Sequence, residues 1–349
     1  MSEGERARMA KFSTGEYEYE LVADWGQLPE GREWGQVAAV ANDSEDNVHV
    51  FTRAANPYRV FDKSGKLLDH WGEGLFKSAH GICVTPDHNS YLVDVGAHVV
   101  SKFDHNGKEL MTLGTRDKPS DTGLTRQTRQ PTPLSSGEDK GPASGSYTEA
   151  IEMINPVGHP GPPFNRPTDV TVAPNGDLYV SDGYDNCCVH RFAADGTLIQ
   201  SWGMPGNASE LRNTKDSPGH FHCVHGIWFH KDRVYVNDRE SNRIQIFGPT
   251  GDYIDTWTGL LRPTKIYIDP QTDLVYVSEL DDRVSVLDLD GNVLSHIGPG
   301  HKIGYSDEGR SHEPGKFWGP HGIWADSEGS VYVSEVLEGQ RLQKFARVK

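Results

Sequence analysis

The feature that most constrains the fold of this chain is a repeated four-strand pattern with a period of roughly forty residues. Each copy has an apolar strand, a turn, a tyrosine-valine strand ending in an acidic residue, and two further strands. Five full copies occupy 36–72, 80–114, 166–203, 225–259 and 262–298, and a sixth, at 321–349, has only three strands. Because such units bury their apolar faces against their neighbours, this period is typical of β-propeller blades.

The N-terminal region can supply the strand that the sixth copy lacks. Residues 17–26 (YEYELVADWG) match the outer strand of the other copies. Pairing of this strand with the last copy would cover an open sheet edge and close the ring. The sequence therefore predicts an all-β fold, a six-bladed β-propeller, with one domain at 17–349 and a flexible tail at 1–16.

Two insertions, at 115–160 and 204–218, interrupt the period. Each joins an outer strand to the next inner strand, and the first is too long for an ordinary connection between blades. We expect both insertions to end on the face where inner strands begin and to form a lid there. A surface loop or an oligomer contact is the alternative for 115–160.

Composition excludes several classes of partner. A formal net charge of −16 argues against nucleic acid or an anionic membrane as a partner. No apolar run is long enough to span a membrane, and the first residues lack the apolar segment of a secretion signal. The four cysteines, Cys83, Cys187, Cys188 and Cys223, have no disulfide or zinc-finger spacing. We expect reduced thiols in a cytoplasmic protein.

The tripeptide His-Gly-Ile opens three of the repeats, at His80, His225 and His321. The aligned position along the six repeats reads Gln36, His80, Thr168, His225, Thr264 and His321. Because a closed ring brings equivalent positions around one axis, histidines in every second blade should converge. Three imidazoles with an open coordination position are typical of catalytic zinc. The sequence therefore predicts one divalent transition metal, expected to be zinc.

A tyrosine and two arginines follow the acidic position of the second strand in three repeats. They are Arg53, Tyr184 and Arg239. In antiparallel neighbours the end of one strand lies beside the start of the other, so these side chains should surround the metal. Nearby cations and a metal favour the phenolate form of a tyrosine, which can then act as a base, and arginine binds carboxylates in a bidentate manner. The alternative is a set of polar rim residues that bond loop carbonyls.

Other polar residues fit structural roles. We expect His98 to be a rim histidine rather than a fourth ligand, and His220 and His222 to lie in a solvated loop. The recurring acidic residues are Asp94, Asp182, Asp238, Glu279 and Glu335. Because they also occur in repeats without a histidine, we expect them mainly to cap turns, with some orienting the imidazoles.

Four stretches carry a resemblance to known proteins: HGICVTPDHNSYLVDVGAH, RPTDVTVAPNGDLYVSDGYDN, VNDRESNRIQIF and PHGIWADSEGSVYVSE. The repeats resemble NHL repeats, and the ring at 17–349 resembles the catalytic core of peptidyl-α-hydroxyglycine α-amidating lyase. The resemblance implies zinc at the three histidines. It also implies proton transfer and substrate-anion binding by the tyrosine and the two arginines.

The chain departs from this family at several positions. Gly319 stands where the family has a methionine, and Gly322 stands where it has an aspartate that contributes to a structural calcium site. The family's disulfide cysteines are absent near Arg239 and before Arg166. These departures remove one calcium ligand and both disulfides, and they reshape the substrate pocket.

Three functions are compatible with this pattern. The first is a zinc-dependent lyase that cleaves the C–N bond of an α-hydroxylated amide-type small molecule carrying a carboxylate. The second is a metal-dependent hydrolase of a small ester, lactone or amide, in which the arginines stabilise an oxyanion. The third is a non-enzymatic NHL-repeat binding scaffold, which would have no need for histidines around one channel.

Overall fold

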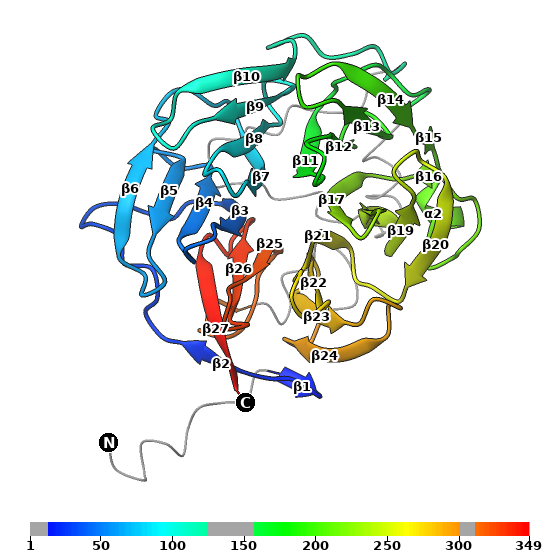
Figure 1. Cartoon of the computed structure of the whole chain (residues 1–349). Coiled ribbons are helices and arrows are strands. Elements are labelled where there is room, and N and C mark those ends of the chain that lie inside the picture. Colours follow the sequence, from blue (N-terminus) through cyan, green and yellow to red (C-terminus); the bar gives the residue numbers. More distant parts are fainter. Residues whose placement is uncertain (1–12, 125–156, 301–310, 349) are drawn as a thin grey trace, which may run out of the picture.

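The chain forms a ring of six antiparallel sheets around a central axis (Figure 1). This computed structural model describes residues 13–124, 157–300 and 311–348. The arrangement confirms the predicted all-β, six-bladed β-propeller. Among the described residues, no helix has the length and apolar character needed to cross a membrane.

The blades follow one another in chain order, and in blades A to E the first strand is nearest the axis and the fourth is farthest from it. Blade A contains β3 (Val37–Asn42), β4 (Val48–Thr52), β5 (Tyr58–Phe61) and β6 (Leu67–Trp71), and blade B contains β7 (Ala79–Val84), β8 (Ser90–Asp94), β9 (Val99–Phe103) and β10 (Glu109–Gly114). Blade C contains β11 (Pro167–Val172), β12 (Leu178–Asp182), β13 (Cys188–Phe192) and β14 (Leu198–Trp202), and blade D contains β17 (Val224–His230), β18 (Arg233–Asp238), β19 (Arg243–Phe247) and β20 (Tyr253–Thr258). Blade E contains β21 (Pro263–Ile268), β22 (Val275–Glu279), β23 (Arg283–Leu287) and β24 (Val293–Ile297).

Blade F combines the two ends of the chain. It contains β25 (Pro320–Ala325), β26 (Val331–Glu335), β27 (Leu342–Val348) and, as its outer strand, β2 (Glu18–Val22). Strand β2 pairs antiparallel with β27, which is the position that the sequence predicted for the N-terminal strand. Because β2 pairs with β27, the outer edge of β27 is covered and its backbone groups are hydrogen-bonded within the sheet.

A strand precedes the expected domain boundary at Tyr17. Strand β1 (Ser13–Gly15) pairs antiparallel with β24 and adds a fifth strand to blade E. The backbone N–H of Tyr17 donates to Ser295 Oγ at 2.6 Å. The last part of the expected flexible tail at 1–16 is therefore bound to a sheet edge, and residues 1–12 lie outside the described residues.

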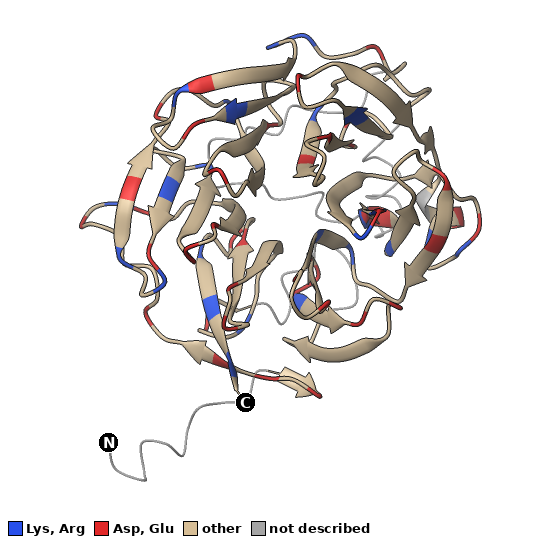
Figure 2. Cartoon of the chain, viewed as in Figure 1, with Lys and Arg blue, Asp and Glu red and all other residues tan. Residues whose placement is uncertain are grey.

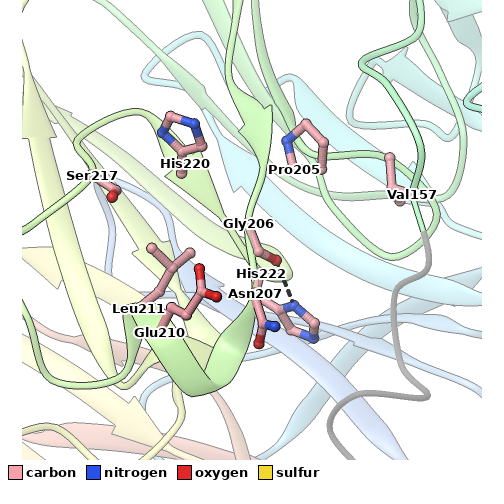
Figure 3. Close-up of a pocket in the computed structure, with 9 residues that line it drawn as sticks. All are labelled: Val157, Pro205, Gly206, Asn207, Glu210, Leu211, Ser217, His220 and His222. Atoms are coloured by element: carbon pink, nitrogen blue, oxygen red, sulfur yellow. Dashed lines mark hydrogen bonds between the residues drawn. The ribbon is translucent and has the colours of Figure 1, made fainter.

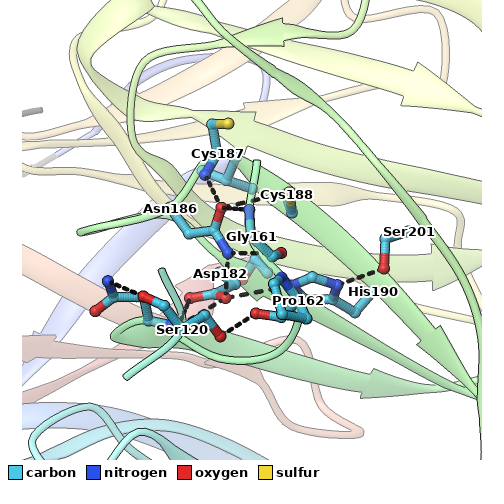
Figure 4. A network of polar contacts seen from close by, with 12 residues as sticks. Ser120, Gly161, Pro162, Asp182, Asn186, Cys187, Cys188, His190 and Ser201 are labelled. Atoms are coloured by element: carbon cyan, nitrogen blue, oxygen red, sulfur yellow. Dashed lines mark hydrogen bonds and ion pairs between the residues drawn. The ribbon is translucent and has the colours of Figure 1, made fainter. Parts of the chain in front are cut away.

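The described ends of the first insertion are bound to blade C (Figure 4). Gly161 donates its backbone N–H to Asn186 Oδ1 at 3.1 Å, and Asn186 Nδ2 donates to Asp182 Oδ2 at 2.8 Å. Ser120 Oγ donates to the carbonyl of Pro162, which joins the two arms of the insertion. Residues 125–156, the middle of this insertion, lie outside the described residues, so the lid expected from the two insertions stays a prediction.

The second insertion forms a small layer beside blades C and D. Strand β15 (Met204–Pro205) pairs in parallel with β16 (His220–Phe221), and the short helix α2 (Ala208–Leu211) lies between them in sequence. Acidic and basic positions are interspersed around the whole ring in the view of Figure 2, with no blade carrying only basic residues.

The recurring acidic residues hold the loops that lead into the inner strands. In each case a carboxylate oxygen accepts a backbone N–H from the loop just before the inner strand, and the pairs are Asp94–Ser78, Asp182–Asn165, Asp238–His222, Glu279–Leu261 and Glu335–Trp318. This confirms their expected turn-capping role, which fixes the start of each inner strand at the axis.

Candidate metal centre

The three predicted histidines meet at the axis of the ring. His80, His225 and His321 stand near the start of β7, β17 and β25, and all three are buried. Their candidate ligand atoms lie within 4.8 Å of one another, and their ring centroids are 4.7 to 4.9 Å apart. Among the described residues they form the single such cluster.

A main-chain contact to the next blade orients each imidazole. The Nδ1 atoms of His80, His225 and His321 lie 2.5, 2.8 and 2.6 Å from the carbonyl oxygens of Thr168, Thr264 and Ala38, respectively. A carbonyl only accepts, so Nδ1 must carry the proton and Nε2 keeps its lone pair. This is the tautomer in which a histidine binds a metal through Nε2.

The same contacts correct the predicted alignment of blade A. Val37 lies opposite Thr52, just as Pro167 lies opposite Asp182 in blade C, so the residue equivalent to the histidines is Ala38 and not Gln36. Blade A has neither histidine nor threonine at this position, and no side chain marked it in the sequence. The alternation of histidine with other residues is unaffected.

The structure also explains the glycine after each histidine. A Cβ atom on Gly81 would lie 2.7 Å from the carbonyl oxygen of Thr168, and one on Gly226 would lie 2.6 Å from that of Thr264. At Gly322 it would lie 2.9 Å from Ala39 Cα. The inner strands of neighbouring blades approach so closely that only glycine fits beside the imidazole contact.

The imidazoles are neutral over a wide pH range. Burial lowers the pKa of His80 and of His225 well below the usual value, with repulsion from neighbouring histidines and arginines adding to the effect. Burial, together with Arg53, lowers the pKa of His321 to about 3. Three neutral imidazoles with converging lone pairs fit a transition metal such as zinc.

Tyr184 lies directly against this cluster. Its hydroxyl oxygen is 2.9 Å from Nε2 of His80 and 3.1 Å from Nε2 of His225. The hydroxyl can donate its one proton to only one of these two nitrogen atoms. The lone pair of the other Nε2 is left unsatisfied, which favours a bound cation. Gly183 makes the approach possible, because a Cβ there would lie 1.9 Å from the carbonyl oxygen of Val224.

Arg239 connects Tyr184 to a buried ion-pair network. Its Nη1 donates to the Tyr184 hydroxyl at 3.4 Å and its Nε donates to Glu240 Oε1 at 2.7 Å. Glu240 also accepts from Arg262 Nη2 at 2.9 Å. Burial alone would raise the pKa of Glu240, but the Arg262 and Arg239 guanidiniums lower it to about 2. Arg239 is therefore rigidly held beside the predicted base.

Arg53 is a half-buried cation with neutral partners. Its Nε donates to the Ala79 carbonyl at 3.1 Å and its Nη1 donates to Gln36 Oε1 at 2.5 Å. Within the described residues no carboxylate lies at ion-pair distance from it, and burial lowers its pKa. A half-buried guanidinium without a carboxylate partner, beside a candidate metal site, can bind an anionic ligand.

Sequence reasoning missed a third arginine at this site. The Arg166 guanidinium carbon lies 5.1 Å from the Tyr184 ring centroid, and that of Arg239 lies 5.3 Å away, both within the range of cation–π contacts. Arg166 also lies 3.7 Å from Asp185. The Arg-Pro pair that opens blade C recurs at Arg262 in blade E, and this repetition was the available signal.

The remaining predicted histidines lie outside the cluster. His98 Nδ1 accepts the backbone N–H of Arg166 at 3.1 Å. His220 and His222 line a separate hollow of about 590 Å³ (Figure 3). The hollow lies between the described parts of the two insertions, with Val157 on one side and α2 on the other. The backbone N–H of Glu240 donates to the His222 carbonyl at 3.2 Å, which joins the hollow to the Arg239 network.

A buried ion pair that the sequence reasoning also missed lines the same small cavity as the three imidazoles. Lys265 Nζ is 2.5 Å from Asp169 Oδ2, and both residues line a cavity of about 10 Å³ together with the three histidines. A structural calcium does not fit here. Gly322 offers no carboxylate, a side chain there would collide with Ala39, and an ammonium group already supplies positive charge.

Comparisons with known proteins agree with the fold and point to a class of enzyme. The NHL repeat family matches residues 164–192. The chain is 28% identical over 267 residues to the peptidylglycine alpha-amidating monooxygenase of Rattus norvegicus, a match that covers 67% of this chain and 22% of that protein. This chain thus spans less than a quarter of the length of the rat relative.

A second relative is matched over most of its length. The chain is 24% identical over 346 residues to peptidyl-alpha-hydroxyglycine alpha-amidating lyase 2 of Drosophila melanogaster, covering 90% of this chain and 72% of that protein. Among solved structures, a gluconolactonase of Xanthomonas campestris has a TM-score of 0.59 at 13% identity, covering 100% of this chain and 94% of that chain. That likeness concerns the fold alone. The chain is therefore a six-bladed β-propeller that matches the NHL repeat at 164–192 and resembles peptidyl-α-hydroxyglycine α-amidating lyases in sequence.

Proposed function

We propose that this protein is a metal-dependent lyase that cleaves the C–N bond of an N-acyl-α-hydroxyglycine or a closely related carbinol. The observation that carries the proposal is the Tyr184 hydroxyl, held 2.9 and 3.1 Å from two imidazoles of the candidate metal centre. A potential base thus lies beside a potential Lewis acid, with arginines around both. The Drosophila melanogaster relative, which is named as a lyase, supports the same reaction class.

The metal would be held by Nε2 of His80, His225 and His321. Nitrogen donors and an open fourth position favour zinc. When bound, the ion supplies Lewis-acid polarisation of the substrate hydroxyl. All other parts of the reaction fall to side chains of this chain.

Tyr184, in its phenolate form, would take the proton of the substrate hydroxyl as a general base and become a phenol. The electron pair of that O–H bond becomes the second bond of a carbonyl group, and the C–N bond breaks with its electrons on nitrogen. The proton on Tyr184 then passes to that nitrogen. An amide and a glyoxylate-type carbonyl leave, and the tyrosine returns to its starting state.

Arg53 and Arg239 would hold the carboxylate of the substrate. Arg53 has no carboxylate partner among the described residues, so an incoming anion would compensate its charge. Arg239 is fixed by Glu240 and reaches the Tyr184 hydroxyl, so it can orient the substrate toward the base. A fork of guanidinium groups matches a planar carboxylate.

The proposal is tested with N-benzoyl-α-hydroxyglycine and the zinc-loaded protein in ¹⁸O-labelled water. Lyase chemistry gives benzamide, which takes no oxygen from solvent, together with glyoxylate. Hydrolysis of the same amide would give benzoate containing one solvent oxygen. A binding scaffold would give neither product above the rate of a His80→Ala/His225→Ala/His321→Ala variant, which corrects for spontaneous breakdown.

A further inference from the structure

We infer that the Asp169–Lys265 ion pair positions the histidines of the metal centre, because it links the inner strands of blades C, D and E close to His225. The inference rests on the proposed metal site. It assigns a role to two residues that belong to blades without a histidine ligand, blade C and blade E.

The pair spans an intervening blade. Asp169 lies on β11 and Lys265 on β21, and both are buried, with β17 of blade D between them in chain order. The Asp169 Oδ2 atom that accepts from Lys265 Nζ at 2.5 Å also accepts the backbone N–H of Ile227 at 3.0 Å. Ile227 is two residues after His225 in β17. A single carboxylate oxygen thus joins blades C, D and E.

Both members of the pair also adjoin a carbonyl that orients a ligand. Asp169 directly follows Thr168, whose carbonyl oxygen lies 2.5 Å from His80 Nδ1. Lys265 directly follows Thr264, whose carbonyl oxygen lies 2.8 Å from His225 Nδ1. A shift of either charged residue therefore moves the acceptor that sets the angle of an imidazole.

The surroundings make this pair sensitive to change. Asp169 Oδ1 is buried without a hydrogen-bond partner among the described residues, and Lys265 Nζ lies 5.6 Å from the Trp228 ring. A Cβ atom on Gly81 would lie 2.8 Å from Asp169 Oδ1, so any side chain at position 81 would displace the carboxylate. Removing one charge leaves the other buried and uncompensated, and the strands must adjust.

Cobalt(II) is the probe, because its visible spectrum reports ligand geometry without any need for turnover. We expect Lys265→Met to shift the d–d bands and to weaken cobalt affinity at least tenfold in competition with a chelator. The matched control is Lys215→Met, which breaks the exposed Lys215–Asp255 pair and should change neither quantity. If Lys265→Met does not fold, Lys265→Arg is measured in the same way.

A double variant separates positioning from simple stability. Asp169→Leu/Lys265→Met replaces the pair with apolar side chains and should recover thermal stability relative to the single variant while cobalt binding stays weak. Cobalt affinity and bands equal to wild type in these variants would overturn the inference, even if the melting temperature falls. A wild-type protein that binds no cobalt would instead refute the proposed metal site.

Discussion

His321 Nδ1 lies 2.6 Å from the carbonyl oxygen of Ala38, a contact between residues 283 positions apart that joins the last blade to the first. The other two histidines make the same contact with the blade that follows them. Closure of the ring and orientation of the imidazoles therefore depend on the same repeated contact. A substitution that separates two blades at this contact should also change the orientation of the imidazole there.

Gly322→Ala should weaken this closure. The added Cβ would lie 2.6 Å from Ser334 Oγ and 2.9 Å from Ala39 Cα, so blades F and A must separate. We expect a loss of about 1–3 kcal/mol in the free energy of unfolding, measured by urea denaturation. Gly248→Ala is the control, because the nearest atom to its Cβ is 3.8 Å away. Equal stability of the two variants would show that the close approach is not required.

Tyr184→Phe should separate catalysis from metal binding. The phenyl ring keeps the packing but loses the hydroxyl that lies 2.9 Å from His80 Nε2. We expect kcat on N-benzoyl-α-hydroxyglycine to fall about 10²- to 10⁴-fold while zinc content stays the same. Tyr253→Phe, on the outer strand β20, should retain full activity. A Tyr184→Phe enzyme with normal kcat would exclude the tyrosine as the base.

Arg53→Gln should impair recognition of the substrate carboxylate. The half-buried guanidinium has neutral partners in the described part of the chain, so its charge is available to a ligand. We expect binding of N-benzoylglycine to weaken by about 1.5–3 kcal/mol, measured by calorimetry. Binding of its neutral methyl amide should change little. An equal loss for both ligands would mean that Arg53 acts on the shape of the pocket instead.

The metal-free protein should lose stability as the pH falls below about 6.5. Burial lowers the pKa of the three histidines, that of His321 to about 3, so the unfolded chain takes up protons that the folded chain does not. Each such histidine lowers stability by about 1.4 kcal/mol per pH unit within this window and has no effect above it. For His321 this loss of stability stops near the pKa of the folded state, about 3.

Urea unfolding of the metal-free protein between pH 7.5 and 5 measures this slope. His321→Gln should make the slope of stability against pH shallower by the contribution of one histidine. His105→Gln, at an exposed turn, should leave the slope unchanged. A His321→Gln slope identical to wild type would mean that His321 is protonated equally in both states.

Most of the fold could be predicted because its information is repeated along the chain. The His-Gly-Ile tripeptides, the acidic strand ends and the outer strand at 17–26 each recur or match a recurring element. Prediction failed where one repeat lacks the marker, as at Ala38, or where a short polar segment pairs only because a sheet edge is nearby, as at β1.

The site could be predicted only in part for a related reason. Equivalent positions identify the histidines, but they do not reveal a contact between different positions of different blades. The partners Asp169 and Lys265 are 96 residues apart, and their meeting depends on how closely blades C, D and E pack. The closeness of Arg166 to Tyr184 likewise depends on side-chain direction, which the repeat does not specify.

Metal content tests the central claim most directly. Elemental analysis of the purified protein after dialysis should give about one zinc or other divalent transition metal per chain, since three neutral imidazoles leave one coordination position open. The His80→Ala/His225→Ala/His321→Ala variant should retain its fold by circular dichroism and contain almost no metal. Stoichiometric metal in that variant, or none in the wild type after zinc loading, would contradict the account.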